Sequence, residues 1–350
     1  MNIAYYVSGH GFGHISRSYE VVKYLLEKKE VSRIFINSTR KDFIKDKKEN
    51  LIFRDVAVDV GMIQQTSISL DVPKTLEAIF EFERIQKQII EQEISFLKQE
   101  KIDLVISDSS SLPFVIADKL DLPSYFVGNF TWDFIYQNYI NVSHHFQRYA
   151  NSLREEYALC KFGFILPFHC PMHSIPKKKN IGIVGRKTSL DRQTIREMVQ
   201  FSPENKYFLF SFGAYGISEE LDFGNLQDNE WIVVSGYEGL TGEKVIDVNS
   251  VDYPSLVKAC DYVLTKPGYG ILSESYLANT AVIYTDRGDF AEYPYLVNAL
   301  SKFHYSAYLP QKDLLSFNLK TAVFSINAQR NTKKIPQLLD GRQEVFLEIF

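Results

Sequence analysis

Residues 2–17 read NIAYYVSGHGFGHISR, and this stretch decides the fold class of the chain. It begins with a short apolar run, passes through a loop containing Gly9, Gly11 and Gly13, and enters a helical pattern that we expect to start near Ser16. A strand that turns through glycines into a helix is the first half of a βα unit, from which parallel sheets are built. Glycines allow close backbone approach to a ligand, and the N–H groups of a helix N-terminus attract anions. We therefore predict that this loop binds a ligand.

The same alternation of short apolar runs and helical patterns continues along the chain. We predict strands at 2–7, 33–37, 51–56, 104–107, 124–127, 162–166, 207–212, 231–235, 244–248, 262–265 and 281–284. The clearest helix is predicted over 71–99, with Asp71 as its N-cap and Pro73 in its first turn. Strands that alternate with helices predict an α/β fold with parallel sheets.

The length of 350 residues predicts about two domains. The best linker is FHCPMHSIPKKKN at 168–180, which contains two prolines and three consecutive lysines. We therefore predict an N-terminal domain at 1–168, a linker at 169–182, a second domain at 183–328 and a C-terminal helix within 329–350.

Composition excludes several classes of protein. The 39 basic and 43 acidic residues give a net charge of -4, which provides no global basic field for nucleic acid. The cysteines (Cys160, Cys170 and Cys260) are too few and too scattered for a disulfide framework. The histidine and cysteine clusters at 144–145 and 169–173 lack a full set of ligands, so we predict no metal site.

The sequence carries no charged segment before its first strand and no apolar run of about 18 residues. We therefore expect a cytoplasmic protein. The basic run at 40–48 is either a solvated helix face or a contact with the inner face of a membrane. The oligomeric state is left open.

The first loop does not have the dinucleotide fingerprint. After Gly9 and Gly11, the third required glycine is replaced by His14, which disfavours a nicotinamide cofactor. His10 and His14 carry imidazoles that can take up a proton near neutral pH. The alternative is that both histidines only form hydrogen bonds within the loop.

Polar side chains follow two further predicted strands. Asp108 comes directly after one, and Asn129, Trp132 and Asp133 follow the next. The carboxyl ends of parallel strands meet at one edge of a sheet, where open α/β sheets bind ligands. Trp132 either stacks on a sugar or packs in the core, and Asp133 either bonds a hydroxyl or caps a helix.

The second half repeats the arrangement. Gly213 follows one predicted strand, and TKPGYGILSE at 265–274 leads from another strand into a helix. A diphosphate placed on that helix N-terminus would have Lys266 nearby as a point charge. Glu274 either accepts two ribose hydroxyls or is an ordinary acid favoured by the helix dipole. A further acid-containing loop, RGDFAEYP at 287–294, follows the next strand.

Together these motifs resemble the GT-B glycosyltransferases, in particular the branch with the peptidoglycan N-acetylglucosaminyltransferase and the glycosyltransferase-like front half of plant arabinokinases. The most specific segments are YYVSGHGFGHISR at 5–17, GNFTWDFIY at 128–136, KPGYGILSE at 266–274 and EYPYLVNAL at 292–300. The resemblance spans nearly the whole chain. It implies two Rossmann-like domains with parallel sheets that face each other across a cleft.

The resemblance also implies roles for individual residues. His14 matches the histidine that ends the glycine-rich loop, Glu274 the acid that grips the donor ribose, and Gly213 the phosphate-side loop. The implied donor-binding residues are Gly213, Ala214, Lys266, Gly268, Tyr269, Gly270, Ser273, Glu274, Glu292 and Asn298. The implied acceptor-binding residues are Gly11, Gly13, Asp108, Asn129 and Trp132.

The implied activity is a metal-independent, inverting glycosyl transfer of the hexosyltransferase class from a nucleotide sugar, expected to be a UDP-sugar, to an acceptor hydroxyl. His14 is the expected base, with His10 and Asp133 as reserves. No cofactor is expected, and the acceptor is a glycan, a lipid-linked molecule or a small molecule. Because no kinase portion is recognised, we expect no phosphoryl transfer.

Two departures from the family pattern leave open the donor sugar and the identity of the base. His10 and Phe12 stand where the family often has smaller residues, and the glutamines typical of N-acetylglucosamine donors are missing near Glu292. Two alternatives to transfer are a nucleotide-sugar epimerase of the same fold and a non-catalytic nucleotide-sugar sensor.

Overall fold

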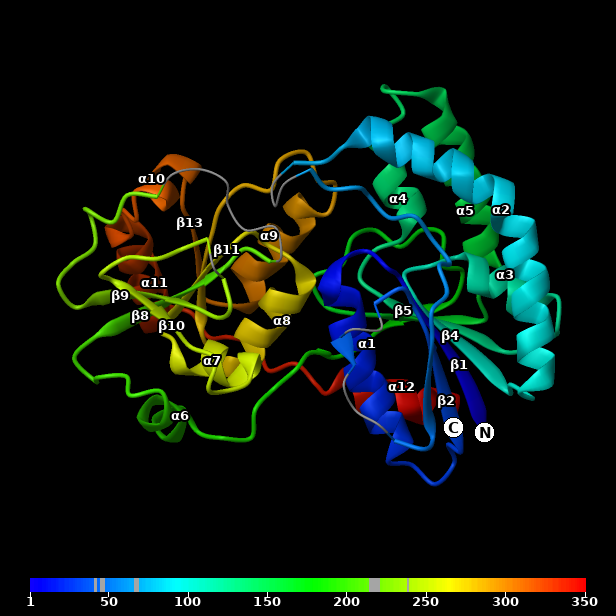
Figure 1. Cartoon of the computed structure of the whole chain (residues 1–350), viewed down its shortest axis with the longest axis horizontal. Helices are drawn as coiled ribbons and strands as arrows, with labels where there is room; N and C mark the ends of the chain where they lie inside the picture. Colours follow the sequence, from blue (N-terminus) through cyan, green and yellow to red (C-terminus); the bar gives the residue numbers. More distant parts are fainter. Residues whose placement is uncertain (41–42, 45–47, 66–68, 214–220, 238) are drawn as a thin grey trace.

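The structure, a computed structural model, describes residues 1–350 apart from 41–42, 45–47, 66–68, 214–220 and 238. The described strands form two sheets, and neighbouring strands in both sheets are parallel. Figure 1 shows the two sheets in separate halves of the molecule, each with its own helices. The predicted α/β fold class is therefore confirmed. None of the helices in the described part of the chain combines the length and apolar character needed to cross a membrane.

The first sheet has the strand order β3-β2-β1-β4-β5-β6-β7. Its strands are β1 (Asn2–Val7), β2 (Arg33–Asn37), β3 (Leu51–Arg54), β4 (Leu104–Asp108), β5 (Ser124–Gly128), β6 (Phe162–Ile165) and β7 (Lys178–Asn180). The helices of this half are α1 (Gly11–Leu26), α2 (Val72–Gln99), α3 (Leu112–Asp118), α4 (Trp132–Gln137) and α5 (His144–Ala158).

The second sheet has the order β10-β9-β8-β11-β12-β13. Its strands are β8 (Lys206–Ser211), β9 (Glu230–Val234), β10 (Val245–Asp247), β11 (Tyr262–Thr265), β12 (Ala281–Tyr284) and β13 (Ser306–Tyr308). The remaining helices are α6 (Arg192–Met198), α7 (Tyr253–Ala259), α8 (Tyr269–Ala278), α9 (Tyr293–Phe303), α10 (Gln311–Leu315), α11 (Lys320–Thr332) and α12 (Gly341–Ile349).

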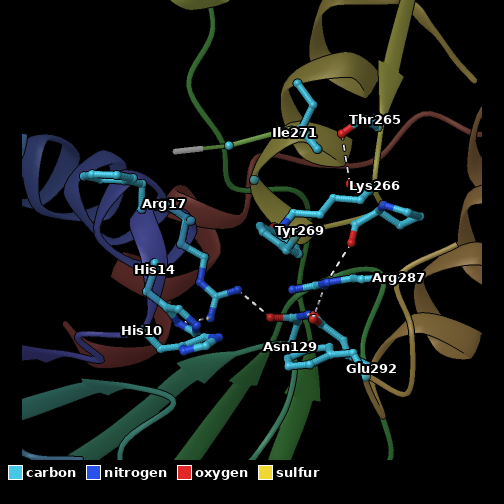
Figure 2. A pocket seen from close by; sticks show the side chains of 18 of the residues that line it. His10, His14, Arg17, Asn129, Thr265, Lys266, Tyr269, Ile271, Arg287 and Glu292 are labelled. Atoms are coloured by element: carbon cyan, nitrogen blue, oxygen red, sulfur yellow. Dashed lines mark hydrogen bonds and ion pairs between the residues drawn. The ribbon is translucent and has the colours of Figure 1, made fainter. Parts of the chain in front are cut away.

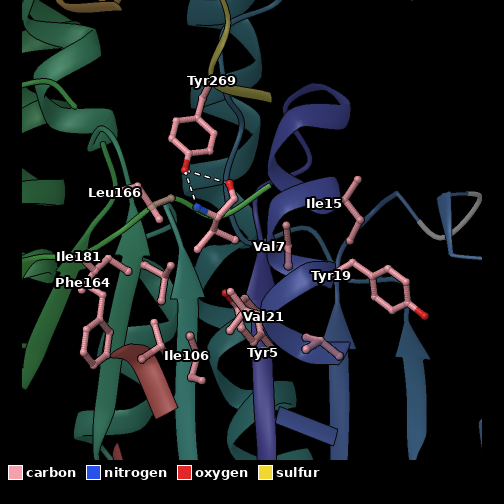
Figure 3. Packing of buried hydrophobic residues seen from close by; sticks show 14 of the residues in the cluster. Tyr5, Val7, Ile15, Tyr19, Val21, Ile106, Phe164, Leu166, Ile181 and Tyr269 are labelled. Atoms are coloured by element: carbon pink, nitrogen blue, oxygen red, sulfur yellow. Dashed lines mark hydrogen bonds between the residues drawn. The ribbon is translucent and has the colours of Figure 1, made fainter. Parts of the chain in front are cut away.

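Alternate residues of β1 are buried in different cores. Tyr5 and Val7 pack with Ile15 and Val21 of α1, as Figure 3 shows. Their neighbour Tyr6 lies in the other core, with residues of α2 and α3. Successive side chains of a strand point to opposite faces, so a strand covered by helices on both sides is apolar throughout. This explains why β1 reads as a continuous apolar run.

The C-terminal helix returns to the first half of the molecule. Val345 of α12 joins the core beneath α1, and the rings of Phe346 and Tyr24 lie with centroids 6.4 Å apart. Figure 1 shows α12 beside α1, close to both chain termini. The last helix therefore packs on the half of the molecule that begins the chain.

Each sheet has one place where the strand order reverses direction. In the first sheet the order reverses between β1 and β4, and in the second sheet it reverses between β8 and β11. Ligands bind open α/β sheets outside the carboxyl ends of the strands at such a reversal. The segments that follow β1 and β11 hold His10, the first turn of α1, Lys266 and the first turn of α8, all of which the sequence predicted as functional.

Three differences from the sequence predictions have physical causes. Helix α1 begins at Gly11 and not near Ser16, so His14 lies in its first turn. Glycines disfavour helix in isolation, but tertiary packing of the buried face of α1 overrides that preference. Strands β7 and β13, which were not predicted, have three residues each and too little side-chain pattern to be recognised. Strand β7 lies in the segment predicted as linker and pairs with β6.

Candidate active site

The N-terminal ends of α1 and α8 meet between the two sheets. A Cβ atom placed on Gly270 would lie 3.5 Å from the Cα of Gly13, which puts the two helix ends in van der Waals contact. Neither helix has a side-chain cap or an acidic residue in its first turn. The N–H groups of their first turns and the two helix dipoles therefore direct partial positive charge into one space.

A cavity of about 280 Å³ occupies this space (Figure 2). It is lined by residues of both halves, including many that the sequence predicted as functional. These are His10, Gly11, Gly13, His14, Asn129, Gly213, Lys266, Gly268, Tyr269, Gly270 and Glu292. The structure thus brings together residues of the predicted acceptor, base and donor sets.

His14 is held by a buried carboxylate. Its Nδ1 lies 2.7 Å from Oδ1 of Asp108. Nδ1 also lies 3.1 Å from Nη2 of Arg17, but the carboxylate contact is shorter and a carboxylate oxygen only accepts, so we assign the proton to Nδ1 and the free lone pair to Nε2. Asp108 was predicted as an acceptor-binding residue, but it is fully buried beneath the histidine and does not line the cavity.

Arg17 binds the same carboxylate through two nitrogens on one edge of its guanidinium. Its Nε donates to Oδ2 of Asp108 and its Nη2 donates to Oδ1, both at 2.7 Å. Burial alone would raise the pKa of Asp108, but the charge and hydrogen bonds of Arg17 hold that pKa well below its usual range. Asp108 is therefore a carboxylate at neutral pH.

Further hydrogen bonds cross from the first half to the second. Asn129 accepts from Nη1 of Arg17 at 2.5 Å and donates its Nδ2 to Oε1 of Glu292, also at 2.5 Å. The other oxygen of Glu292 accepts from Arg287 at 3.1 Å, and Arg287 also donates to the carbonyl of Pro267. Glu292, predicted to lie near the donor sugar, thus sits between the halves.

The side of the cavity formed by α8 carries two basic side chains, Lys266 and Arg287. Burial, together with the charge of Arg287, lowers the pKa of Lys266 to about 7. Lys266 precedes the N-terminus of α8, so an anion bound there would favour the charged ammonium. This side of the cavity is suited to a phosphate group.

His10 is packed between aromatic rings. Its ring centroid lies 5.2 Å from that of Trp132 and 6.3 Å from that of Phe290. Gly61 leaves room for it, because a Cβ there would come within 2.9 Å of the imidazole. Burial, followed by the charges of His14 and Arg287, lowers the pKa of His10 well below its usual range. His10 therefore stays neutral at physiological pH.

A second cavity of about 300 Å³ adjoins the first. The two share Phe12, Ser211, Phe212 and Gly213, and the second extends to the end of β9 and to α7. Sequence reasoning did not assign a function to the β9 end, although it follows a predicted strand in the same way as the other loops. The two cavities together offer an elongated site.

Several predicted residues do not line the main cavity. Trp132 is buried and donates its Nε1 to Asp59 at 3.0 Å. Asp133, a predicted reserve base, accepts a hydrogen bond from Ser174 at 2.5 Å. Asn298 lines a different cavity, beside α9. Ala214 lies outside the described residues.

Glu274 and Ser273 are buried one turn inside α8. The Glu274 carboxylate accepts from Nε of Arg186 at 2.6 Å. Burial raises the pKa of Glu274, and the charge of Arg186 opposes this. Ser273 donates its hydroxyl to the carbonyl of Gly270. Neither residue lines the main cavity.

Sequence reasoning missed Arg17 and did not assign a role to Arg287. A detectable signal for Arg17 is its spacing of three residues from His14, which places both on one face of α1. Among the described residues there is no group of three or more histidine, cysteine, aspartate or glutamate side chains arranged to hold a metal ion.

Comparisons with known proteins agree with this architecture. Residues 1–168 match the model of the family described as glycosyl transferase family 1. An L-arabinokinase of Arabidopsis thaliana is 27% identical over 318 residues, which cover 89% of this chain and 31% of that protein. The chain therefore spans about a third of the length of this curated relative.

Two solved structures illustrate the likeness of fold. A UDP-glucosyltransferase from Polygonum tinctorium gives a TM-score of 0.66 at 9% identity, covering 99% of this chain and 97% of its own. MurG of Acinetobacter baumannii gives a TM-score of 0.58 at 13% identity, covering 99% of this chain and 98% of its own. The chain has the GT-B fold, as the sequence motifs predicted.

Proposed function

We propose that the protein is a glycosyltransferase that moves a sugar from a nucleotide-sugar donor, of the UDP-sugar class, to a hydroxyl of an acceptor. The observation that carries this proposal is one cavity lined on one side by His14, which is bonded to a buried aspartate, and on the other side by a helix N-terminus with basic side chains. The match of the N-terminal half to a glycosyl transferase family supports it.

In the proposed reaction His14 is the base. Its Nε2 takes the proton of the acceptor hydroxyl as the oxygen forms a bond to the anomeric carbon of the donor sugar. The bond from that carbon to the diphosphate oxygen breaks with its electron pair, and nucleoside diphosphate leaves. One displacement from the opposite face inverts the anomeric carbon. Asp108 stabilises the imidazolium that forms, as a buried carboxylate does for other catalytic histidines.

The leaving diphosphate is proposed to lie on the N-terminus of α8. There the backbone N–H groups after Gly268 and the side chains of Lys266 and Arg287 balance its charge. We propose that these groups make a metal ion unnecessary. The adjoining cavity at the ends of β8 and β9 is the proposed place for the nucleoside.

The proposal is tested first by binding and then by turnover. A donor present at about 100 times its dissociation constant stabilises a protein by about 2.7 kcal/mol, so UDP and UDP-sugars should raise the melting temperature measurably. Release of UDP should then require both a donor and an acceptor. If no nucleotide raises the melting temperature, the proposal fails. Isomerisation of the donor sugar without an acceptor would instead identify an epimerase.

A further inference from the structure

The base and the donor-sugar side of the site are joined by an unbroken series of hydrogen bonds. His14 bonds Asp108, Asp108 bonds Arg17, Arg17 bonds Asn129, and Asn129 bonds Glu292 across the junction between the two halves. Figure 2 shows His14, Arg17, Asn129 and Glu292 side by side in the cavity wall. Each distance in the series is 2.5 or 2.7 Å.

Arg17 is a buried charge whose partners come from several elements. It is 2% exposed, it meets Asp108 of β4 and Asn129 after β5, and its guanidinium lies 4.9 Å from the ring centre of Tyr269 in α8. A buried guanidinium is costly to desolvate unless its donors have well-placed acceptors. The position of Arg17 is therefore defined by groups in both halves of the molecule.

Asn129 can bridge its two partners in one orientation. Arg17 can only donate and Glu292, as a carboxylate, can only accept, so Oδ1 must face the arginine and Nδ2 must face the glutamate. Turning the amide over would set two donors against each other and two acceptors against each other. A change at Glu292 therefore acts on Arg17 through this amide.

We infer that Arg17 and Asn129 are positioning residues that tie the orientation of His14 to the state of Glu292 on the opposite half. This inference rests on the proposed function, in which Glu292 meets the donor sugar. A sugar hydroxyl that bonds Glu292 Oε1 competes with Asn129, which frees the amide to shift relative to Arg17 and thereby alters the hold of Arg17 on Asp108. The orientation of His14 therefore depends on whether a sugar is bound at Glu292.

The first experiment needs no ligand. The Nδ1–H proton of His14, bonded to Asp108, is followed by NMR as a low-field signal in protein labelled with ¹⁵N-histidine. Arg17→Lys keeps the charge but loses the two parallel bonds to Asp108, and we expect the signal to move or broaden. Arg40→Gln is the matched control, because Arg40 lines the same cavity but bonds the carbonyl of Gly9. The signal should stay in place in that variant.

The second experiment adds the donor. UDP-glucose, UDP-galactose and UDP-N-acetylglucosamine are tested beside UDP, which lacks the sugar. We expect at least one UDP-sugar to shift the His14 signal while UDP does not. In Asn129→Ala the shift should disappear, although the affinity for UDP changes by less than about threefold, because Asn129 is joined to the proposed diphosphate ligand Arg287 through Glu292. Turnover by Arg17→Lys should fall by about 100-fold, the usual effect of misplacing a reacting group by about 1 Å.

The outcomes separate the inference from the proposed function. An unchanged His14 signal in Arg17→Lys would overturn the role of Arg17 whether or not the protein is a transferase. A sugar-dependent shift that persists in Asn129→Ala would overturn the coupling. If UDP does not bind, the proposed function and the coupling to Glu292 both fail, whereas the measurement on Arg17→Lys is unaffected. Melting temperatures of the variants show whether each is folded.

Discussion

The N-terminal ends of α1 and α8 have similar backbones but different charges. Each follows a parallel strand, begins at a glycine-rich turn, lacks a side-chain cap and faces the same cavity. The end of α1 carries His14 above the ion pair of Arg17 with Asp108, in which the two charges compensate each other. The end of α8 is flanked by Lys266 and Arg287, and Arg287 pairs with the carboxylate of Glu292.

This difference explains how one local structure can serve two purposes. A helix N-terminus attracts an anion through its N–H groups and dipole, and cationic side chains beside it strengthen that attraction. At α8 they add to it, so the end suits a diphosphate. At α1 the ion pair keeps the histidine side close to neutral, which suits a group that must accept a proton. The following predictions test this division, from the largest expected effect to the smallest.

Replacing His14, the proposed base, should have the largest effect. His14→Ala should lower kcat by about 10²- to 10⁴-fold, the usual contribution of general base catalysis. Donor affinity, measured by calorimetry with UDP, should change little because the cations of the α8 side are untouched. His173→Ala, which alters an exposed histidine outside the cavity, is the matched control and should behave as the wild type. If His14→Ala loses UDP affinity by as much as it loses kcat, the α1 end also binds the diphosphate, which contradicts the division of roles between α1 and α8.

Removing a cation from the α8 side should act mainly on donor binding. Lys266→Met should weaken UDP binding by roughly 10- to 100-fold, because a hydrogen bond to a charged group contributes about 1.5–3 kcal/mol. Lys258→Met is the control, since the Lys258 ammonium bonds the carbonyl of Leu190 outside the cavity. If Lys266→Met keeps normal UDP affinity but loses turnover, Lys266 acts in the chemical step and not in binding of the diphosphate.

Titration of Lys266 should change the affinity for UDP with pH, by less than the changes predicted above. Its pKa of about 7 means that the free protein loses this charge as the pH rises through neutrality. A bound diphosphate favours the charged ammonium, so binding takes up a proton and weakens by up to about tenfold from about pH 6 to about pH 9.

Ionisation of the nucleotide itself acts in the opposite direction, and a control removes it from the comparison. UDP gains negative charge as its terminal phosphate loses a proton, which strengthens binding to a cationic site as the pH rises. The arginine of Lys266→Arg stays charged throughout this range, so the pH dependence of UDP affinity in this variant comes from the ionisation of UDP alone. If the wild type and Lys266→Arg show the same pH dependence of UDP affinity, the lysine does not titrate in the site.

Sequence alone predicted the elements whose side chains carry a pattern. Strand β1 was recognised because both of its faces are buried, and the turn from β1 into α1 was recognised from its three glycines. Strand β7 was missed because its residues Lys178–Asn180 are exposed and pair with β6 only through the backbone. A strand of this kind has no hydrophobic periodicity to detect.

The charged network of the site was harder to predict for a different reason. A charged residue on an amphipathic helix is ordinarily solvated, and Arg17 is buried because Asp108, 91 residues later, compensates its charge. The spacing of Arg17 from His14 indicates a shared helix face, but the pairing of Arg17 with Asp108 follows from the fold and has no local sequence signature. The same holds for Glu274, whose partner Arg186 lies 88 residues earlier.

Glu274 gives the smallest expected effect and the sharpest test of the resemblance. The family pattern implies that this acid grips the donor ribose, which predicts a large loss of UDP affinity on its removal. In the structure it lies outside the main cavity and its carboxylate binds Arg186, so Glu274→Gln should weaken UDP binding by threefold or less. The amide oxygen of the glutamine can still accept from the arginine, which keeps α8 in place. A tenfold loss in calorimetry would show that the ribose draws Glu274 away from Arg186, and the nucleoside would then extend along α8 as well as the end of β9.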